Sequence, residues 1–380
     1  MGAGPLTGLR VIELAGLAPG PFACTVLADL GAEVIRVDRA TPGPDVLSFD
    51  NDPLRRSRRS IGVDTKTPDG VELVLKLVEN ADVLVEGFRP GVTERMGLGP
   101  ADCHARNPRL IYGRITGWGQ DGPLAQRAGH DINYIGLSGA LEAIGREGER
   151  PVPPLNLVAD FGGGGLLLAM GILAALYERA SSGKGQVVDA SMVDGSALLA
   201  TSLYGLKANG VWAGKRGTNL LDGGAPFYDT YETADGKYLA VGAIEMRFWA
   251  DLVRVLGLSG EDLPFHFDKN EWPRLRKILA GAIGKYTRDE LVALAEGTDA
   301  CITPVLTPEE APSHPHNVAR GTFVEVGGVA LPAPAPKFDR TPAGTPSAPH
   351  DTGADTEQVL GELGLNTAEI ARLREAGAIN

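Results

Sequence analysis

The chain has 380 residues, of which 43% are hydrophobic and 22% charged, and its formal net charge is −12. This length predicts two or three domains with a large buried core. The negative charge disfavours nucleic acid and anionic membrane as partners, so any anionic ligand needs a local basic cluster. Three widely spaced cysteines, Cys24, Cys103 and Cys301, argue against a disulfide framework or a cysteine metal site, and they favour a reducing, cytoplasmic setting.

The N-terminal half alternates short apolar runs with helical patterns. We expect strands at 9–15, 33–37, 60–64, 81–86, 110–116 and 186–191, and helices at 21–30 and 66–78. This βαβ rhythm predicts an α/β fold with a doubly wound, largely parallel, Rossmann-like sheet. The glycines within 16–20 do not form GxGxxG, so a dinucleotide site is not indicated.

A basic run lies between the second and third of these strands. It contains Arg55, Arg56, Arg58 and Arg59. One interpretation is a solvated basic loop, and another is a phosphate site, because several charge-assisted donors can hold a phosphate together. The second interpretation could also recruit Arg39, Lys66, Arg89 and Arg95.

The pattern changes after residue 212. We assign 1–212 to a large domain, 213–224 to a glycine-rich linker and 225–320 to a smaller α+β domain with a hairpin near 234–237. Residues 332–349 are proline-dense and predict an extended arm, followed by helices at 356–363 and 367–376. The apolar run 166–177 is too short to span a bilayer and predicts a core helix.

His130 follows a glycine-rich loop and precedes a predicted helix at 132–143. It could be a cap residue or a satisfied core histidine. Alternatively, it could be an acid/base group, because the amides of Asp131 and its successors would point toward a ligand at this helix start.

Asp160 precedes four consecutive glycines, Gly162 to Gly165, and a long apolar helix. It could be an N-cap alone. Glycines are unfavourable in a first helical turn, so we expect them to allow close approach by a ligand or another chain. Helix N-terminal placement should lower the pKa of Asp160 and keep it ionised as a base or nucleophile. Glu245 reads as an ordinary helix start and Asp222 as a turn residue.

Together, several motifs resemble the family III CoA-transferase (CaiB/BaiF) superfamily and its racemase branch. The resemblance covers nearly the whole chain. It lies in residues 5–11, 23–39, 59–66, 86–97, 129–134, 160–163, 183–190, 219–228 and 241–245.

The resemblance implies acyl-CoA thioester substrates, an interlocked homodimer, and a C-terminal segment, 321–380, that completes the large domain. His130 and Asp160 would be the two acid/base groups, Glu245 would orient His130, and the Asp131 N–H would polarise the thioester oxygen. Gly129, Ile132, Asn133 and Tyr134 would hold the thioester end. The coenzyme A moiety would be held by Arg39, Val63, Asp64, Thr65, Lys66, Gly87, Phe88, Arg89 and Arg95.

The expected activity is interconversion of (R)- and (S)-2-methylacyl-CoA through an enolate, with no metal or redox cofactor and with coenzyme A bound as part of the substrate. An alternative is a CoA-transferase in which Asp160 is the nucleophile and an aspartyl-CoA thioester forms. A non-catalytic CoA or nucleic-acid binder is the third possibility, supported only by the arginine run.

Overall fold

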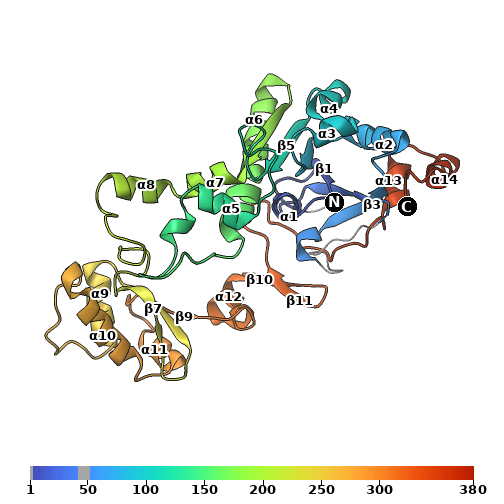
Figure 1. Ribbon diagram of the computed structural model, residues 1–380. Helices are drawn as coiled ribbons and strands as arrows, with labels where there is room; N and C mark the ends of the chain where they lie inside the picture. The colour runs from blue at the N-terminus through green and yellow to red at the C-terminus, as the bar shows by residue number, and fades with distance from the viewer. Residues whose placement is uncertain (1–2, 42–51) are drawn as a thin grey trace. The chain divides into compact units, whose positions relative to one another are not determined.

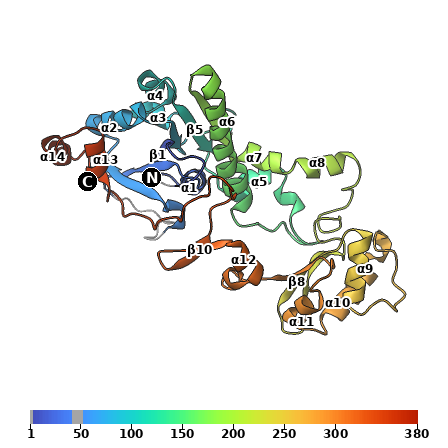
Figure 2. The ribbon, with the colours of Figure 1, turned by 180° about the vertical axis from the view of Figure 1, so that it is seen from behind.

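The computed structural model describes residues 3–41 and 52–380, and the chain divides into two compact units. The first unit comprises Met1–Ser138, Leu155–Leu199 and Gly321–Asn380. The second comprises Gly139–Pro154 and Ala200–Arg320. The glycine-rich segment 213–224 therefore falls inside the second unit. Figure 1 follows the chain by colour, and Figure 2 shows it from behind.

A six-stranded parallel sheet forms the centre of the first unit, in the order β3-β2-β1-β4-β5-β6. All six predicted strands are present. The sheet order reverses between β1 and β4, and in such sheets the crevice at the carboxyl ends of the strands on either side of the reversal is the usual ligand site. The strands are β1 (Arg10–Leu14), β2 (Glu33–Arg39), β3 (Arg58–Val63), β4 (Val83–Glu86), β5 (Ile111–Thr116) and β6 (Gln186–Ser191).

Helices cover both faces of this sheet, as the doubly wound prediction requires (Figure 1). On one face, alternate residues of the strands share a hydrophobic core with four helices: α2 (Pro68–Glu79), α4 (Pro100–Arg106), α13 (Thr356–Glu362) and α14 (Thr367–Glu375). On the other face, α1 (Pro19–Asp29) contacts β1, β2 and β4, while α6 (Leu167–Ser182) contacts β5 and β6. The central strands β1, β4 and β5 are buried on both faces, which explains their largely apolar sequences.

Three further helices of the first unit are short: α3 (Val92–Met96), α5 (Asp131–Leu137) and α7 (Met192–Leu199). The predicted helix at 132–143 therefore ends earlier, at Leu137. A π-helix, η3 (Leu157–Leu166), runs directly into α6.

The continuous helix from Leu157 to Ser182 has 26 residues, and by length and composition alone it could cross a membrane. It is longer than the apolar run 166–177 that the sequence suggested. Of its most apolar 18-residue window, 39% is buried inside the protein. Core helices of soluble proteins have the same composition, so its length by itself does not assign it to a bilayer.

The second unit contains a three-stranded antiparallel sheet of β7 (Tyr228–Glu232), β8 (Tyr238–Gly242) and β9 (Ile302–Val305). The predicted hairpin corresponds to β7 and β8. Its helices are α8 (Thr201–Ala208), α9 (Met246–Val255), α10 (Trp272–Ile283), α11 (Arg288–Leu294) and α12 (Pro315–Arg320).

His266 lies in the core of the second unit. It is 1% exposed, stacks on Trp249 at 5.0 Å between ring centroids and packs edge-on against Phe227. Burial lowers the pKa of His266. Asp222 is a turn residue, as predicted, and its carboxylate accepts hydrogen bonds from the amides of Gly217, Asn219 and Gly224.

The C-terminal segment begins with a hairpin, β10 (Phe323–Val326) and β11 (Val329–Pro332), and then runs without helix or strand to α13. Its last residues return to β3. The carbonyl of Ala378 accepts the Asp64 amide at 2.8 Å, and Ile379 forms an antiparallel bridge with Val63.

Candidate active site

A cavity of about 620 Å³ lies at the carboxyl ends of the parallel strands, beside the point where the sheet order reverses. Residues at the ends of β1, β2 and β3 line it, with Phe88 and Met96 following β4. Six of the residues predicted to hold coenzyme A are in its wall: Arg39, Val63, Asp64, Thr65, Lys66 and Phe88.

Four cations surround this edge of the sheet without neutralising partners. Arg39, Lys66, Arg89 and Arg95 are exposed, and none forms an ion pair within residues 3–41 and 52–380. Arg39 and Lys66 line the cavity itself. An acidic protein therefore presents a local cationic site, which suits a ligand with several phosphates.

The neighbouring arginine run does not contribute in this way. Arg56 forms a buried pair with Asp29, and Arg58 forms one with Glu13 at 2.8 Å. Arg59 pairs with Glu33 and with Glu362. The interpretation of this run as a phosphate site is therefore corrected for these three arginines, because carboxylates of the same chain occupy their guanidinium groups.

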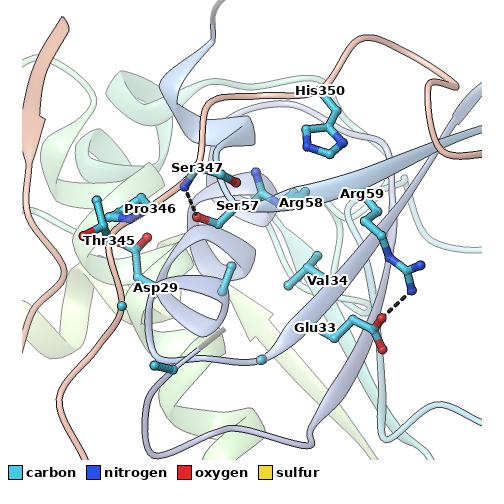
Figure 3. Close-up of a pocket in the computed structure, with 14 residues that line it drawn as sticks. Asp29, Glu33, Val34, Ser57, Arg58, Arg59, Thr345, Pro346, Ser347 and His350 are labelled. Atoms are coloured by element: carbon cyan, nitrogen blue, oxygen red, sulfur yellow. Dashed lines mark hydrogen bonds and ion pairs between the residues drawn. The ribbon is translucent and has the colours of Figure 1, made fainter. Parts of the chain in front are cut away.

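A second cavity, of about 240 Å³, lies at the opposite end of the sheet, where β2 and β3 begin (Figure 3). The Arg59–Glu33 pair crosses its wall, and Ser57 accepts a hydrogen bond from the amide of Ser347 at 3.1 Å. Its charged side chains already have partners in this chain: Arg59 pairs with Glu33 inside the wall, while Asp29 and Arg58 pair with Arg56 and Glu13.

A buried charge network supports the loop that follows β4. Arg114 of β5 donates to Glu86 at 2.7 Å and to Glu94 of α3 at 2.8 Å. The other carboxylate oxygen of Glu86 accepts the amide of Phe88 at 2.7 Å. The network thus anchors both ends of the segment that carries Arg89. This network could not be predicted from the sequence, because only the parallel pairing of β4 with β5 brings Glu86 to Arg114.

His130 is the N-cap residue of α5 and is exposed. Its backbone amide donates to the Asn133 side chain at 3.0 Å, and its carbonyl accepts the Asn133 amide at 2.8 Å. These bonds fix the start of the helix, in agreement with the cap interpretation of His130, and the imidazole makes no cap hydrogen bond.

Gly129 precedes this histidine in a crowded position. A Cβ atom there would lie 2.7 Å from the Tyr134 ring and 2.9 Å from Trp118. The Tyr134 hydroxyl donates to the Gly129 carbonyl, and burial raises the pKa of Tyr134 to about 12. Tyr134 therefore shapes the turn before His130, whereas Ile132 and Asn133 are exposed.

Asp160 is the fourth residue of η3, whose N-cap is Asn156. Burial raises the pKa of Asp160 above its ordinary value. The Asn156 side-chain amide, 3.2 Å away, opposes this rise, the Asp131 carboxylate adds to it, and His130 opposes it. The predicted lowering of this pKa by the helix N-terminus is therefore wrong in direction, because loss of hydration outweighs the stabilising groups.

Asn156 provides a prediction about pH. Its side chain donates a hydrogen bond that favours the ionised form of Asp160, so Asn156→Ala should raise the Asp160 pKa further. Where Asp160 acts as the base, the acid limb of the kcat/KM profile should move to higher pH. Profiles of the wild type and the variant, measured with each substrate enantiomer, test this. An unmoved limb for both enantiomers would contradict the assignment.

The four glycines pack inside the chain, where the sequence suggested a ligand or another chain. A Cβ on Gly163 would lie 2.6 Å from the backbone of Ser196 in α7, and one on Gly165 would lie 2.7 Å from the Pro19 carbonyl of α1. Conversely, a Cβ on Gly195 would lie 1.8 Å from the Gly163 carbonyl. Close contact with α1 and α7 therefore explains Gly163 and Gly165.

Asp131 lies between the two candidate acid/base groups. It begins α5 directly after His130, and its side chain accepts hydrogen bonds from the amides of Ala159 and Asp160. The backbone N–H of Asp131 lies in the first turn of α5 and therefore has no acceptor within that helix. The structure thus brings His130, Asp131 and Asp160 into one cluster of the first unit.

Glu245 is the N-cap of α9 in the second unit and is exposed. Its role as the orienting partner of His130 stays a prediction. Within the described residues, 3–41 and 52–380, no group of three or more His, Cys, Asp or Glu side chains could hold a metal ion.

A model of CoA-transferase family III matches residues 6–356, so the chain belongs to this family. α-Methylacyl-CoA racemase of Mus musculus is 51% identical over 371 residues, covering 97% of this chain and 96% of that protein. The Homo sapiens protein of the same name is 49% identical over 372 residues, with the same coverage.

Other members are more distant. Succinyl-CoA:glutarate CoA-transferase of Homo sapiens is 30% identical over 408 residues, covering 99% of this chain and 90% of that protein. The crystal structure of a CaiB/BaiF family protein from Brucella suis superposes with a TM-score of 0.80 at 29% identity, covering 95% of this chain and 100% of that one.

Proposed function

We propose that the protein is a racemase that interconverts (R)- and (S)-2-methylacyl-CoA thioesters. The observation that carries the proposal is the cluster of His130, Asp131 and Asp160 at the starts of α5 and η3. Relatives at 51% and 49% identity named α-methylacyl-CoA racemase support it.

The chemistry follows from the weak acidity of a hydrogen α to a thioester. For one enantiomer His130 removes the proton, and the C–H electron pair moves into the thioester to form an enolate. The Asp131 amide donates to the enolate oxygen, and Asp160, protonated at that stage, returns a proton to the opposite face. For the other enantiomer the roles reverse. A positioned acid/base group contributes roughly 10²–10⁴-fold and an oxyanion donor roughly 10²–10³-fold.

The raised Asp160 pKa suits this scheme, because the same carboxyl group must gain and lose a proton in alternate directions. Proton transfer alone requires neither metal nor redox cofactor, and coenzyme A enters as part of the substrate. The cavity at the carboxyl edge and its unpaired cations support binding of the coenzyme A moiety there.

The direct test uses a single-enantiomer 2-methylacyl-CoA incubated with the protein in heavy water. We expect the other enantiomer to appear and deuterium to enter the α position. A substrate that keeps both its configuration and its α hydrogen would refute the proposal.

The unpaired cations give a second prediction. Arg39→Ala and Lys66→Ala, which remove the two cations that line the cavity, should each raise KM for the thioester about tenfold through the loss of a charged hydrogen bond, with kcat little changed. A higher salt concentration should reduce the difference in KM between each variant and the wild type, because salt screens exposed charges. Lys76→Ala, which removes an exposed lysine of α2 outside the cavity, is the control. Equal KM values in all variants would contradict this placement of the phosphates.

A CoA-transferase is the alternative, because members of the family at 30% identity carry that name. In that reaction Asp160 would attack the acyl-CoA carbonyl and expel the coenzyme A thiolate, which gives a mixed anhydride. The thiolate would then attack the aspartyl carbonyl, so that the acyl group leaves as a carboxylate and an aspartyl-CoA thioester remains. Hydroxylamine trapping at Asp160 and a strict requirement for an acceptor acid would favour this alternative.

We further propose a homodimer in a reducing cytoplasm. Large apolar side chains are exposed along η3, α6 and α7, and an uncovered patch of this kind usually marks an interface. Two of the three free cysteines, Cys24 and Cys103, are buried as thiols. Sedimentation analysis should give a dimer mass, and a monomer at micromolar concentration would contradict the proposal. The exposed side chains are Leu157, Leu166, Met170, Tyr177, Leu198 and Leu199.

A further inference from the structure

The amides at the start of η3 have no partners within their own helix, because the first turn of any helix leaves its N–H groups unused. In η3 these include the amides of Ala159 and Asp160. Both donate to one atom, Oδ2 of Asp131, at 2.7 and 2.8 Å. The first turn of the helix carrying Asp160 is therefore capped from a different helix.

That different helix carries His130. Asp131 is the first residue of α5, and His130 is its N-cap. Within the described part of the chain, the two hydrogen bonds to Asp131 are the ones that join α5 to η3. Asp131 is 4% exposed, so water competes little for these bonds.

We propose that the Asp131 side chain is a positioning residue for proton transfer, because its carboxylate joins the starts of α5 and η3 and so sets the separation of His130 and Asp160. The proposal rests on the proposed function and assigns the carboxylate a task distinct from that of the Asp131 amide. The same bonds hold that amide in place.

Packing also holds η3 in place. Gly163 and Gly165 lie against the backbone of α7 and α1, and the Phe161 ring contacts Phe22 of α1 at 4.7 Å between ring centroids. The hydrogen bonds to Asp131 add a connection to α5, the helix that carries His130. Misplacement of a reacting group by about 1 Å can lower the rate about 10²-fold, so a small shift of η3 is sufficient to affect turnover.

The test compares two substitutions. Asp131→Ala removes both hydrogen bonds and should lower kcat about 10²-fold, with KM for the acyl-CoA little changed. Asp131→Asn keeps an acceptor oxygen without the charge and should retain most of kcat. Asp355→Ala is the matched control, because that carboxylate also accepts a distant backbone amide, that of Ser60 at 2.7 Å, away from the site.

The pH profile separates positioning from a purely structural role. The titratable groups that face Asp160 are His130, Asp131 and Tyr134. Asp131→Asn removes a negative charge that raises the Asp160 pKa, so the acid limb for the enantiomer deprotonated by Asp160 should move to lower pH. This is opposite to the shift expected for Asn156→Ala.

Amide hydrogen exchange of the segment 157–166 gives a readout that does not depend on substrate. Protection at residues 159 and 160 should fall in Asp131→Ala and persist in Asp131→Asn. If the wild type proves inactive with every 2-methylacyl-CoA, the proposed function fails. The exchange measurement would still test whether the Asp131 carboxylate holds the start of η3.

Wild-type kcat in Asp131→Ala would overturn the proposal, as would unchanged amide protection in that variant. If Asp131→Ala does not fold, Asp131→Asn decides the question. Retained kcat with a shifted acid limb supports positioning by the acceptor oxygen, and a loss as large as that of a His130 variant overturns it.

Discussion

Alanine in place of His130 is expected to lower racemisation of both enantiomers by roughly 10²–10⁴-fold while preserving α-hydrogen exchange for one of them. Asp160 remains in this variant, and it can remove and return a proton on its own face of the substrate. The enantiomer whose α hydrogen faces Asp160 should therefore incorporate deuterium with retention of configuration.

Asp160→Asn is the mirror experiment. The amide cannot accept the proton, so racemisation should again fall by roughly 10²–10⁴-fold. His130 now serves one face alone, and exchange with retention should occur for the opposite enantiomer. We expect both variants to fold. His130 is exposed, so its replacement by alanine leaves no buried cavity, and asparagine has nearly the same shape as the aspartate that it replaces.

Each variant is incubated with each enantiomer in heavy water. Mass spectrometry then gives the rate of deuterium uptake, and chiral analysis gives the rate of racemisation. Loss of exchange for the same enantiomer in both variants would contradict the two-base scheme. A transferase gives another pattern, in which Asp160→Asn abolishes acyl transfer and His130→Ala leaves it largely intact.

The second large effect concerns stability. Arg58 is 3% exposed and contacts Glu13, which is 0% exposed, at 2.8 Å. Its guanidinium also donates to the Pro21 carbonyl and to Thr25 at 3.1 Å. Arg36 also pairs with Glu13, at 2.6 Å, and with Asp38 at 2.9 Å. Arg58→Met should lower the free energy of unfolding by about 3 kcal/mol, because it leaves these two buried carboxylates with Arg36 as their shared cation.

Urea denaturation checks this value, with Arg106→Ala as the control. Arg106 pairs with Glu72 and Glu79 at the surface, and exposed pairs contribute about 0–1 kcal/mol. Equal stability losses in the two variants would show that burial does not strengthen the Arg58 contacts. The comparison also tests the structural role assigned to the arginine run.

The parallel sheet could be predicted because its signal is local. The strands contain short apolar runs bounded by polar or glycine-bearing segments, and these runs are most continuous in the central strands, which are covered on both faces. The third strand of the second unit, β9, was missed. Its burial alternates between intermediate and exposed, and it contains Pro304, so its residues do not form the apolar run that reveals a strand.

The candidate acid/base groups were also accessible from sequence. His130 is an N-cap next to a glycine-bearing turn, and Asp160 stands in the first turn of a helix before four glycines. The direction of the Asp160 pKa shift could not be predicted from the sequence. The pKa of Asp160 depends on how much water the surrounding segments remove, and those segments lie far away in the chain.

The sequence by itself determined the strands, the two helix starts that carry His130 and Asp160, and the family, because each depends on residues within a few positions of one another. Only the tertiary structure decided where the sheet order reverses, which cations stay unpaired, and how the Asp131 carboxylate joins α5 to η3. Such features depend on contacts between segments that are remote in sequence. Arg58 of β3 contacts Glu13 of β1 across the intervening strand β2, and the Asp131 carboxylate reaches the Ala159 amide because α5 packs against η3.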